Sequence, residues 1–299
     1  MKQIVLDENL SQISLLGIYA SMLFYAAAFV CFAFNLSRLA SEQKNVRDSA
    51  SKLEKAGLVL MWIALAGHAF GVVARGVAAQ RVPWANMYEF SITGTLVAAV
   101  IYLVAQIAKR EIRYIGTFVA GFITLVLGIA TTVFYVHVKS LMPALQDYWL
   151  VIHVSVAILA TAFFNIAAAL SITYLFKTAK WPSKSKFITR VLALFPEEKR
   201  LEQLSYRFNI IGFILWSFTL IAGAIWAERA WHRYWGWDTK EVWTFIIWTI
   251  YAGYLHANAT RGWNGKRSAW LVVVGFAAII FNFTIVNLYF KGLHVYSGL

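Results

Sequence analysis

The sequence predicts an all-α, polytopic integral membrane protein with about eight transmembrane helices and both termini outside the cytoplasm. Of its 299 residues, 60% are hydrophobic and 14% are charged, and the mean hydropathy is +0.63. A soluble domain carries roughly 25% charged residues. The apolar residues also fall in runs of about 20, the length that a helix needs to cross the ~30 Å hydrocarbon core of a bilayer.

Eight apolar runs are candidates for the spans. We expect the first run to stay in the protein, because residues 1–11 lack the basic stretch and small-residue cleavage site of a signal peptide. The seventh run is short and depends on tryptophans at one end. The runs cover residues 13–36, 57–79, 88–108, 112–134, 149–176, 208–227, 242–258 and 268–290.

The loops between the runs predict the orientation of the chain. Alternate loops hold 19 of the 27 Lys and Arg residues, at 37–56, 109–113, 177–207 and 259–267. By the positive-inside rule these loops face the cytoplasm, and an even number of spans places both termini outside. The net charge of +13 therefore reflects topology, and no nucleic-acid partner is expected. Residues 1–299 form one membrane domain with a cytoplasmic surface segment at 178–206.

The densest chemical signal is the external loop 226–243. Six of its eighteen residues are Trp or Tyr, with Arg, Lys, Asp and Glu interleaved among them. An aromatic belt at the lipid headgroups explains two or three tryptophans in a loop. The higher density, with paired charges, also suits a planar, apolar, dianionic ligand such as a porphyrin. Composition leaves both interpretations open, and residues 238–241 also fit a capping box at the start of the next helix.

The same loop resembles the WWD signature of the haem-handling protein superfamily. The signature is Trp235-Gly236-Trp237-Asp238-Thr239-Lys240-Glu241-Val242-Trp243. The longer run 231–256, continuing through residues 262–263, is similar to the CcsA/ResC branch of System II cytochrome c biogenesis. His232 and Thr239 stand where that branch usually has Gly and Pro. Segments 83–89 and 292–296 also resemble the branch, so the resemblance extends from about residue 60 to the end.

This resemblance implies three ligands of haem iron. His153 and His294, near the external ends of the fifth and eighth runs, are similar to the family's paired external ligands. His256, ~21 Å along the helix from residues 241–242, is similar to its transmembrane ligand, whose opposite ligand comes from the partner subunit. The resemblance implies that the tryptophan loop holds the ring, through Trp231, Trp235, Trp237, Asp238, Glu241 and Trp243.

Five other polar residues have open roles. Asn86 and Glu89, at the external end of the third run, are candidates for a haem propionate, through a bridging cation or a protonated carboxyl in the case of Glu89. For both residues, capping of the helix and anchoring of the loop are the safer interpretation. His68 is expected to be a polar packing residue, His137 to be solvated, and His232 adds a further candidate ligand.

The resemblance implies a function in cytochrome c maturation. Haem b, as the transported substrate, would move from His256 near the cytoplasmic leaflet to the external site and be presented to apocytochrome c. The chain would be a membrane subunit of a CcsA–CcsB (ResC–ResB) holocytochrome c synthase, in a bacterial inner membrane or a thylakoid membrane, and would supply no nucleophile. The implied partners are a CcsB (ResB)-type membrane subunit, apocytochrome c and thiol-reducing thioredoxin-like proteins of the pathway.

Three other functions are compatible with a membrane protein rich in Trp and His. A System I-type haem exporter carries the same WWD loop on a different number of helices. A b-type cytochrome would need His pairs on neighbouring helices at matched depths, and only His153 and His294 match. A transporter of an unrelated substrate would be expected to show broken helices or inverted repeats, and the sequence has neither signature.

Overall fold

The computed structural model describes residues 7–42, 51–108, 115–139, 146–179, 186–290 and 292–293, and within these ranges all regular structure is helical. This confirms the predicted all-α class. The elements are α1 (Glu8–Glu42), α2 (Lys52–Ala79), α3 (Met87–Ala108), α4 (Gly116–Thr132), α5 (Tyr148–Thr178), α6 (Lys186–Ala193), α7 (Glu198–Trp231), α8 (Thr239–Arg261), α9 (Lys266–Phe281), the π-helical η3 (Asn282–Val286) and α10 (Asn287–Tyr289).

A helix lies on each of the eight apolar runs that the sequence predicts as spans. Among the described residues, six helices are long and apolar enough to cross a membrane, namely α1, α2, α3, α5, α7 and the continuous stretch Lys266–Tyr289. Helix α4 has only 17 residues, and α8 begins with polar residues. The polytopic membrane fold is therefore confirmed, whereas the count of eight spans and the location of the termini stay predictions.

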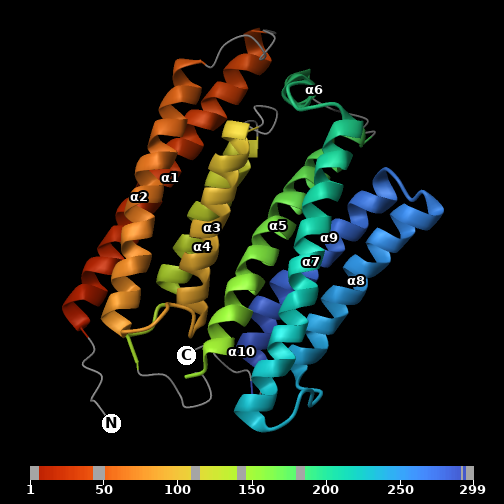
Figure 1. The fold of residues 1–299 in the computed structure, drawn as a ribbon. Coiled ribbons are helices and arrows are strands. Elements are labelled where there is room, and N and C mark those ends of the chain that lie inside the picture. Colours follow the sequence, from red (N-terminus) through yellow and green to blue (C-terminus); the bar gives the residue numbers. More distant parts are fainter. Residues whose placement is uncertain are drawn as a thin grey trace.

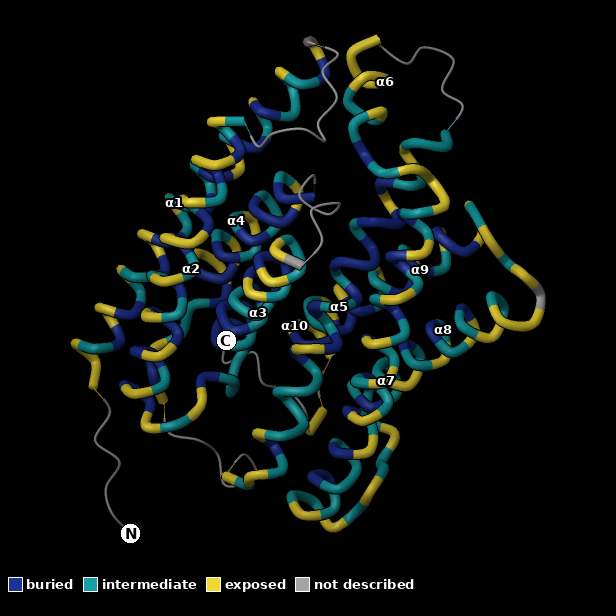
Figure 2. Tube along the Cα trace, turned by 45° about the horizontal axis from the view of Figure 1, so that its top comes forward, coloured by how far each residue is buried: buried dark blue, intermediate teal, exposed yellow. Residues whose placement is uncertain are grey.

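The long helices run alternately in opposite directions, with α1 to α4 on one side and α5, α7, α8 and α9 on the other (Figure 1). The most extensive contacts are between α1 and α2 and between α5 and α7. Buried residues face between the helices, and exposed ones follow their outer surfaces (Figure 2). The bundle therefore consists of two groups of antiparallel helices, which meet along α3 and α5.

Two apolar cores hold these groups together. The larger core joins α1 to α4 and also takes in Leu170 of α5 and Leu204 of α7. The second joins α5, α7, α8 and α9, and in it Phe164 and Tyr251 stack with ring centroids 3.8 Å apart. Trp216 adds a polar link, because its indole N–H donates to the Thr244 carbonyl at 3.1 Å. These contacts fix α8, the helix with the weakest apolar signal, against α7.

Several helices extend beyond the apolar runs from which they were predicted. Helix α7 begins at Glu198, ten residues before the predicted run, so part of the predicted cytoplasmic loop 178–206 is helical. The short α6 in the same loop contains no buried residue. The tryptophan-rich segment is also shorter than predicted, because α7 continues to Trp231 and α8 begins at Thr239. The helices therefore continue past the residues that are apolar enough to lie in the membrane.

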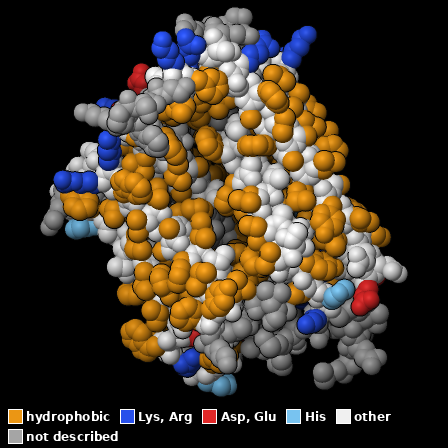
Figure 3. Space-filling view, turned by 180° about the vertical axis from the view of Figure 1, so that it is seen from behind, with side chains coloured by type: hydrophobic (Ala, Val, Ile, Leu, Met, Phe, Trp, Pro, Cys, Tyr) orange, Lys and Arg blue, Asp and Glu red, His pale blue; other side chains and the backbone are white. Residues whose placement is uncertain are grey.

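The surface has the pattern of a membrane protein. Large apolar side chains are exposed along the outer helix faces, such as Leu16 at 66%, Leu23 at 69% and Ile107 at 69%. Figure 3 shows hydrophobic side chains over the middle of one face, with several Lys and Arg side chains at the top and others at the left and at the bottom. A water-exposed surface of this kind would be unfavourable. The chain is therefore an integral membrane protein.

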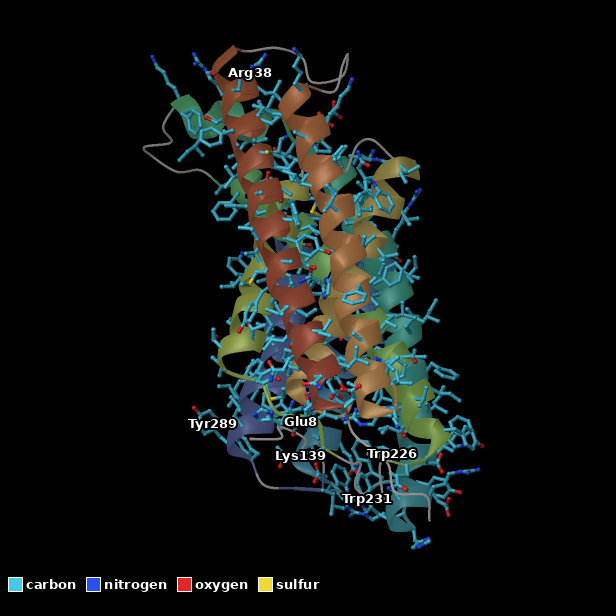
Figure 4. All side chains as sticks on the ribbon, turned by 90° about the vertical axis from the view of Figure 1, so that its left-hand side faces the viewer. Glu8, Arg38, Lys139, Trp226, Trp231 and Tyr289 are labelled. Atoms are coloured by element: carbon cyan, nitrogen blue, oxygen red, sulfur yellow. The ribbon has the colours of Figure 1, made fainter. Side chains whose placement is uncertain are left out.

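The two ends of the bundle differ in chemistry. Arg38 lies at one end, whereas Glu8, Trp226 and Trp231 lie at the other, which we call the tryptophan end (Figure 4). Some of the basic residues used for the orientation, such as those of 109–113, lie outside the described residues. Of the basic residues used for the orientation, Arg38 lies at the end opposite the tryptophan loop, whereas Lys139, which was not used for it, lies at the tryptophan end (Figure 4).

A fusion reporter tests the predicted orientation. A reporter that works only in the periplasm should be active when fused after Leu299, because the basic loops hold the opposite end of the bundle in the cytoplasm. The same reporter inserted in the loop 178–206 should be silent and serves as the control. A silent periplasmic fusion after Leu299, with an active cytoplasmic one, would reverse the orientation.

Candidate functional site

A cavity of about 460 Å³ opens among α3, α4, α5, α7, α8, α9 and η3 at the tryptophan end. This volume is within the roughly 300–1,000 Å³ of typical small-molecule sites. Apolar side chains from both helix groups form most of its wall, including Phe122, Val126, Ile158 and Phe276. Four of the predicted site residues also line it: Asn86, His153, Trp235 and Glu241.

His153 lies in the wall of this cavity, in the second turn of α5. Its Nδ1 is 3.0 Å from the carbonyl oxygen of Thr219 on α7. Because a carbonyl only accepts, Nδ1 carries the hydrogen, and a neutral ring then has its lone pair on Nε2. A backbone contact of this kind is the usual way in which a protein fixes the tautomer and angle of a metal-binding histidine.

The ring of His153 is also fixed by its packing. It stacks on Trp226 with centroids 6.0 Å apart and planes 21° apart. On the α7 side it contacts Gly223, where an added Cβ would lie 2.8 Å from the imidazole Cε1. Only glycine therefore allows α7 to approach the ring so closely. The sequence alone did not reveal the roles of Thr219, Gly223 and Trp226, because these contacts join distant parts of the chain.

The tryptophans of the WWD loop have different positions. Trp235 lines the cavity and meets Trp237 edge to face at 5.8 Å. Trp237 itself is 75% exposed and has a left-handed backbone conformation with φ of 59°. Trp231 packs against Trp226, and Trp243 against Phe281. The structure thus brings one of the four predicted ring-binding tryptophans into the cavity wall.

Asp238 and Glu241 form the predicted capping box at the start of α8. Asp238 Oδ1 accepts from the Lys240 backbone N–H at 2.9 Å, and Glu241 Oε2 accepts from the N–H groups of Gly236 at 2.8 Å and Asp238 at 3.1 Å. Glu241 is buried, and its Oε1 has no hydrogen-bond partner among the described residues. Glu241 therefore fixes the loop with one oxygen and has the other available at the cavity wall.

Lys240 is a cavity residue that the sequence analysis did not select. Its Nζ donates to the carbonyl of Asn282 and to Oδ1 of Asn287, both at 2.8 Å. All three residues line the cavity. The side chain therefore ties the start of α8 to the π-helical end of α9, and it brings an ammonium group to the cavity wall. The only local signal was its place inside the WWD signature.

Asn86 and Glu89 mainly stabilise the start of α3. Asn86 Oδ1 accepts from the Glu89 N–H at 2.8 Å, as expected of a helix cap. The Glu89 carboxylate is fully buried and pairs with Arg75 at 3.1 Å and Arg81 at 2.6 Å. Arg75 also donates to Ser11 and to the Val136 carbonyl. Asn86 lines the cavity, whereas Glu89 does not line it and is paired with Arg75 and Arg81.

Replacing Glu89 with Ala should destabilise the fold strongly. The change leaves the buried Arg75 and the partly buried Arg81 without their carboxylate, and loss of a partner from a buried ion pair costs about 3–5 kcal/mol. Equilibrium unfolding in detergent micelles, followed by tryptophan fluorescence, measures the change in free energy. Arg229→Ala is the control, because the 3.5 Å pair of Arg229 with Asp147 is partly exposed and should contribute less than about 1 kcal/mol. Equal effects of the two variants would contradict the assignment.

The other histidines lie away from the cavity or outside the described residues. His256 is exposed on α8 and does not line the cavity, and His294 lies outside the described residues. His68 is buried among the N-terminal helices, with Nδ1 3.3 Å from the Tyr25 hydroxyl. His137 is exposed, and His232 is an exposed C-cap of α7 with φ of 55°, a left-handed conformation that glycine adopts without strain. The pairing of His153 with His294 stays a prediction.

Comparison with known proteins identifies the family. Residues 84–294 match the family described as cytochrome C assembly protein. This segment contains the WWD loop, His153 and all the residues that line the cavity. The chain therefore belongs to the cytochrome c assembly protein family.

Relatives within this family are of the CcsA type. The chain is 38% identical over 180 residues to the cytochrome c biogenesis protein CcsA of Prochlorococcus marinus, a match that covers 53% of this chain and 57% of the relative. It is 32% identical to CcsA of Cyanophora paradoxa, over 76% of this chain and 82% of the relative. With CcsA of Guillardia theta the identity is 34%, over 73% and 77%. These matches confirm the CcsA-type resemblance of the sequence.

A solved structure shares the fold of this cytochrome c assembly protein. The cytochrome c haem lyase CcmF superposes with a TM-score of 0.65, over 95% of this chain and 47% of that chain, at 15% sequence identity. The likeness extends over nearly the whole helical bundle. At this identity it shows a common fold, and the chain corresponds to about half of the larger protein.

Proposed function

We propose that this chain binds haem b in the cavity and presents it to apocytochrome c, as a subunit of a complex with a CcsB (ResB)-type membrane protein. The observation that carries the proposal is His153, whose ring is oriented by the Thr219 carbonyl in the wall of a cavity that Trp235 also lines. Imidazole is a common axial ligand of haem iron. The membership of the cytochrome c assembly family supports the same substrate.

The groups around the cavity divide the work of holding haem. His153 Nε2 would ligate the iron on one side, and His294 is proposed as the second ligand. The apolar walls and Trp235 would contact the ring, and Lys240 and Glu241 would face polar groups of the substrate. A buried apolar site with a few fixed polar groups suits an amphipathic ring whose carboxylates lie at one edge.

Attachment of haem to the apocytochrome depends mainly on how the reacting groups are positioned. Each thiol S–H of the apocytochrome adds across a vinyl group of haem, so that the sulfur bonds to one carbon and the hydrogen ends on the other, with no net electron transfer. Holding the vinyl and the thiol together in a fixed orientation provides the acceleration. This chain supplies the haem and its orientation, and the incoming apocytochrome supplies the nucleophiles.

His256 fits a site on the path toward the cavity. It is exposed on α8, where a polar side chain within the apolar layer is costly unless a partner satisfies it. We propose that it ligates haem near the cytoplasmic leaflet, opposite a ligand from the CcsB-type subunit. Haem would then move from this outer face of α8 to the cavity at the tryptophan end.

Absorption spectroscopy of the chain purified with the CcsB-type subunit tests whether the complex binds haem. The variant Gly223→Ala tests whether His153 is the ligand. The wild-type complex should contain haem, because the cavity and His153 are both formed in the fold. The methyl group added by the substitution would displace the His153 ring, so haem affinity in a spectral titration should fall about 10- to 100-fold, as for other residues that orient a metal ligand.

Gly253→Ala is the matched control for this titration. It lies on α8, and an added Cβ there meets nothing within 4 Å, so wild-type affinity is expected. A wild-type complex without haem would contradict the proposed function. Haem bound with equal affinity by the wild type and Gly223→Ala would show that His153 is not the ligand.

A further inference from the structure

We infer that Asp238, the aspartate of the WWD signature, is a positioning residue that holds the segment leading into His294. The inference rests on the proposed function, because it takes His294 to be an iron ligand. The two carboxylate oxygens have separate partners. Oδ1 caps α8 by accepting from the Lys240 N–H at 2.9 Å, and Oδ2 accepts from the Leu293 N–H at 2.8 Å. His294 is the next residue in the sequence.

The approach of this segment to Asp238 is very close. A Cβ built at Gly292 would overlap Asp238 Oδ2 and also meet Oδ1 at 3.2 Å. A side chain at position 292 would thus displace either the chain or the Asp238 carboxylate, so the contact favours glycine. The G-L-H segment and the WWD aspartate are therefore two parts of one structural unit.

A second side chain of the signature fixes the same region. Lys240 Nζ donates to the Asn282 carbonyl and to Asn287 Oδ1, and these residues lie at the two ends of the π-helical turn η3. Such π-helical turns inside α-helices are frequent at functional sites. Asp238 and Lys240 together bind the chain at residues 282, 287 and 293. The start of α8 therefore sets the register of the last helix and of the chain that leaves it.

This arrangement gives the aspartate a role distinct from contact with the ring. Asp238 does not line the cavity, whereas its neighbours Lys240 and Glu241 do. Both of its oxygens already accept backbone N–H groups. An axial ligand must hold its nitrogen at a fixed place over the iron, and a hydrogen bond to the preceding residue restricts where the imidazole can lie. Asp238 thus acts on haem through His294.

Two variants break the contact from opposite sides. Asp238→Ser keeps a good helix cap with its single oxygen but is too short to reach Leu293. Gly292→Ala keeps the aspartate and removes the space for the contact. Asp147→Ser is the matched control, because Asp147 caps α5 by accepting from the Trp149 N–H at 2.7 Å. His294→Gly provides the reference for a lost ligand, and all variants are purified with the partner subunit.

The main readout is the spectrum of bound haem with and without imidazole. Asp238→Ser and Gly292→Ala should retain at least half of the wild-type haem content but lose the low-spin spectrum of two histidine ligands. Added imidazole should restore that spectrum, and the same loss and recovery are expected of His294→Gly. Asp147→Ser should match the wild type. A wild-type spectrum in Asp238→Ser and Gly292→Ala, or haem loss that imidazole does not restore, would overturn the inference.

Limited proteolysis tests the same contact without haem. With an epitope tag after Leu299, Asp238→Ser and Gly292→Ala should release the tag several-fold faster than the wild type and Asp147→Ser. Release at the wild-type rate would overturn the inference even in a complex that contains no haem. A wild type without haem, or an unchanged spectrum in His294→Gly, would instead refute the proposed function or its ligand assignment.

Discussion

Replacing His153 with Gly should reduce cytochrome c maturation to less than about one tenth of the wild-type level. Mutation of a residue that only orients a metal ligand already lowers metal affinity or activity about 10- to 100-fold, and here the ligand itself is removed. The change removes the imidazole from the cavity wall and leaves Thr219 and Trp226 in place. Added imidazole should restore part of the activity, because the vacated space has the size of the lost ring. Maturation is measured as covalently bound haem in a reporter cytochrome c, with and without imidazole.

The control for this experiment is His137→Gly, because His137 is exposed and outside the cavity wall. It should mature cytochrome c normally. The same loss and rescue are expected of His294→Gly, the proposed second ligand. Normal maturation by His153→Gly and His294→Gly would show that neither residue is required as an iron ligand, and the cavity would then need another explanation.

Replacing His256 with Ala should produce a different defect from Trp235→Ala. His256 is exposed on α8 away from the cavity, so the variant should fold normally but receive less haem at the tryptophan end. In Trp235→Ala, haem should still reach the His256 site and be missing from the cavity, because a ring that lines the wall is lost. Haem content and spectra of each variant, purified with the CcsB-type subunit, separate the two defects.

Trp237→Ala is the matched variant for Trp235→Ala. The two rings contact each other, yet Trp237 is 75% exposed and does not line the cavity. Its loss should therefore change the haem content of the cavity less than the loss of Trp235. If His256→Ala keeps all its cavity haem while Trp235→Ala loses haem from both sites, the order from the cytoplasmic to the external side must be abandoned.

The main features of the fold could be predicted because they depend on local patterns. Each predicted run of about 20 apolar residues coincides with a helix, and the Asp238 to Glu241 spacing marked the capping box. Helix ends were less predictable, as α7 shows by starting at Glu198. The end of a membrane helix depends on capping and on contacts beyond the apolar layer, which hydropathy does not record.

The candidate site was predictable only in part, for a related physical reason. His153 and Trp235 were selected by residue type and by the signature, and both lie in the cavity wall. The residues that orient them, such as Thr219 and Gly223, have no distinctive chemistry of their own. Thr219 contacts His153 across 66 positions of the chain, and Gly223 contacts it across a still longer interval. A single sequence does not contain that information.

The buried cluster of Arg75, Arg81 and Glu89 constrains how this sequence can diverge. Losing Glu89 leaves two guanidinium groups without their carboxylate, whereas replacing all three residues by apolar residues of similar volume can be neutral or even stabilising. Because Arg75 also bonds Ser11 and the Val136 carbonyl, the cluster connects α1, α2, α3 and the chain after α4. Glu89 should therefore not be lost alone: homologues that lack the carboxylate should also lack the two arginines.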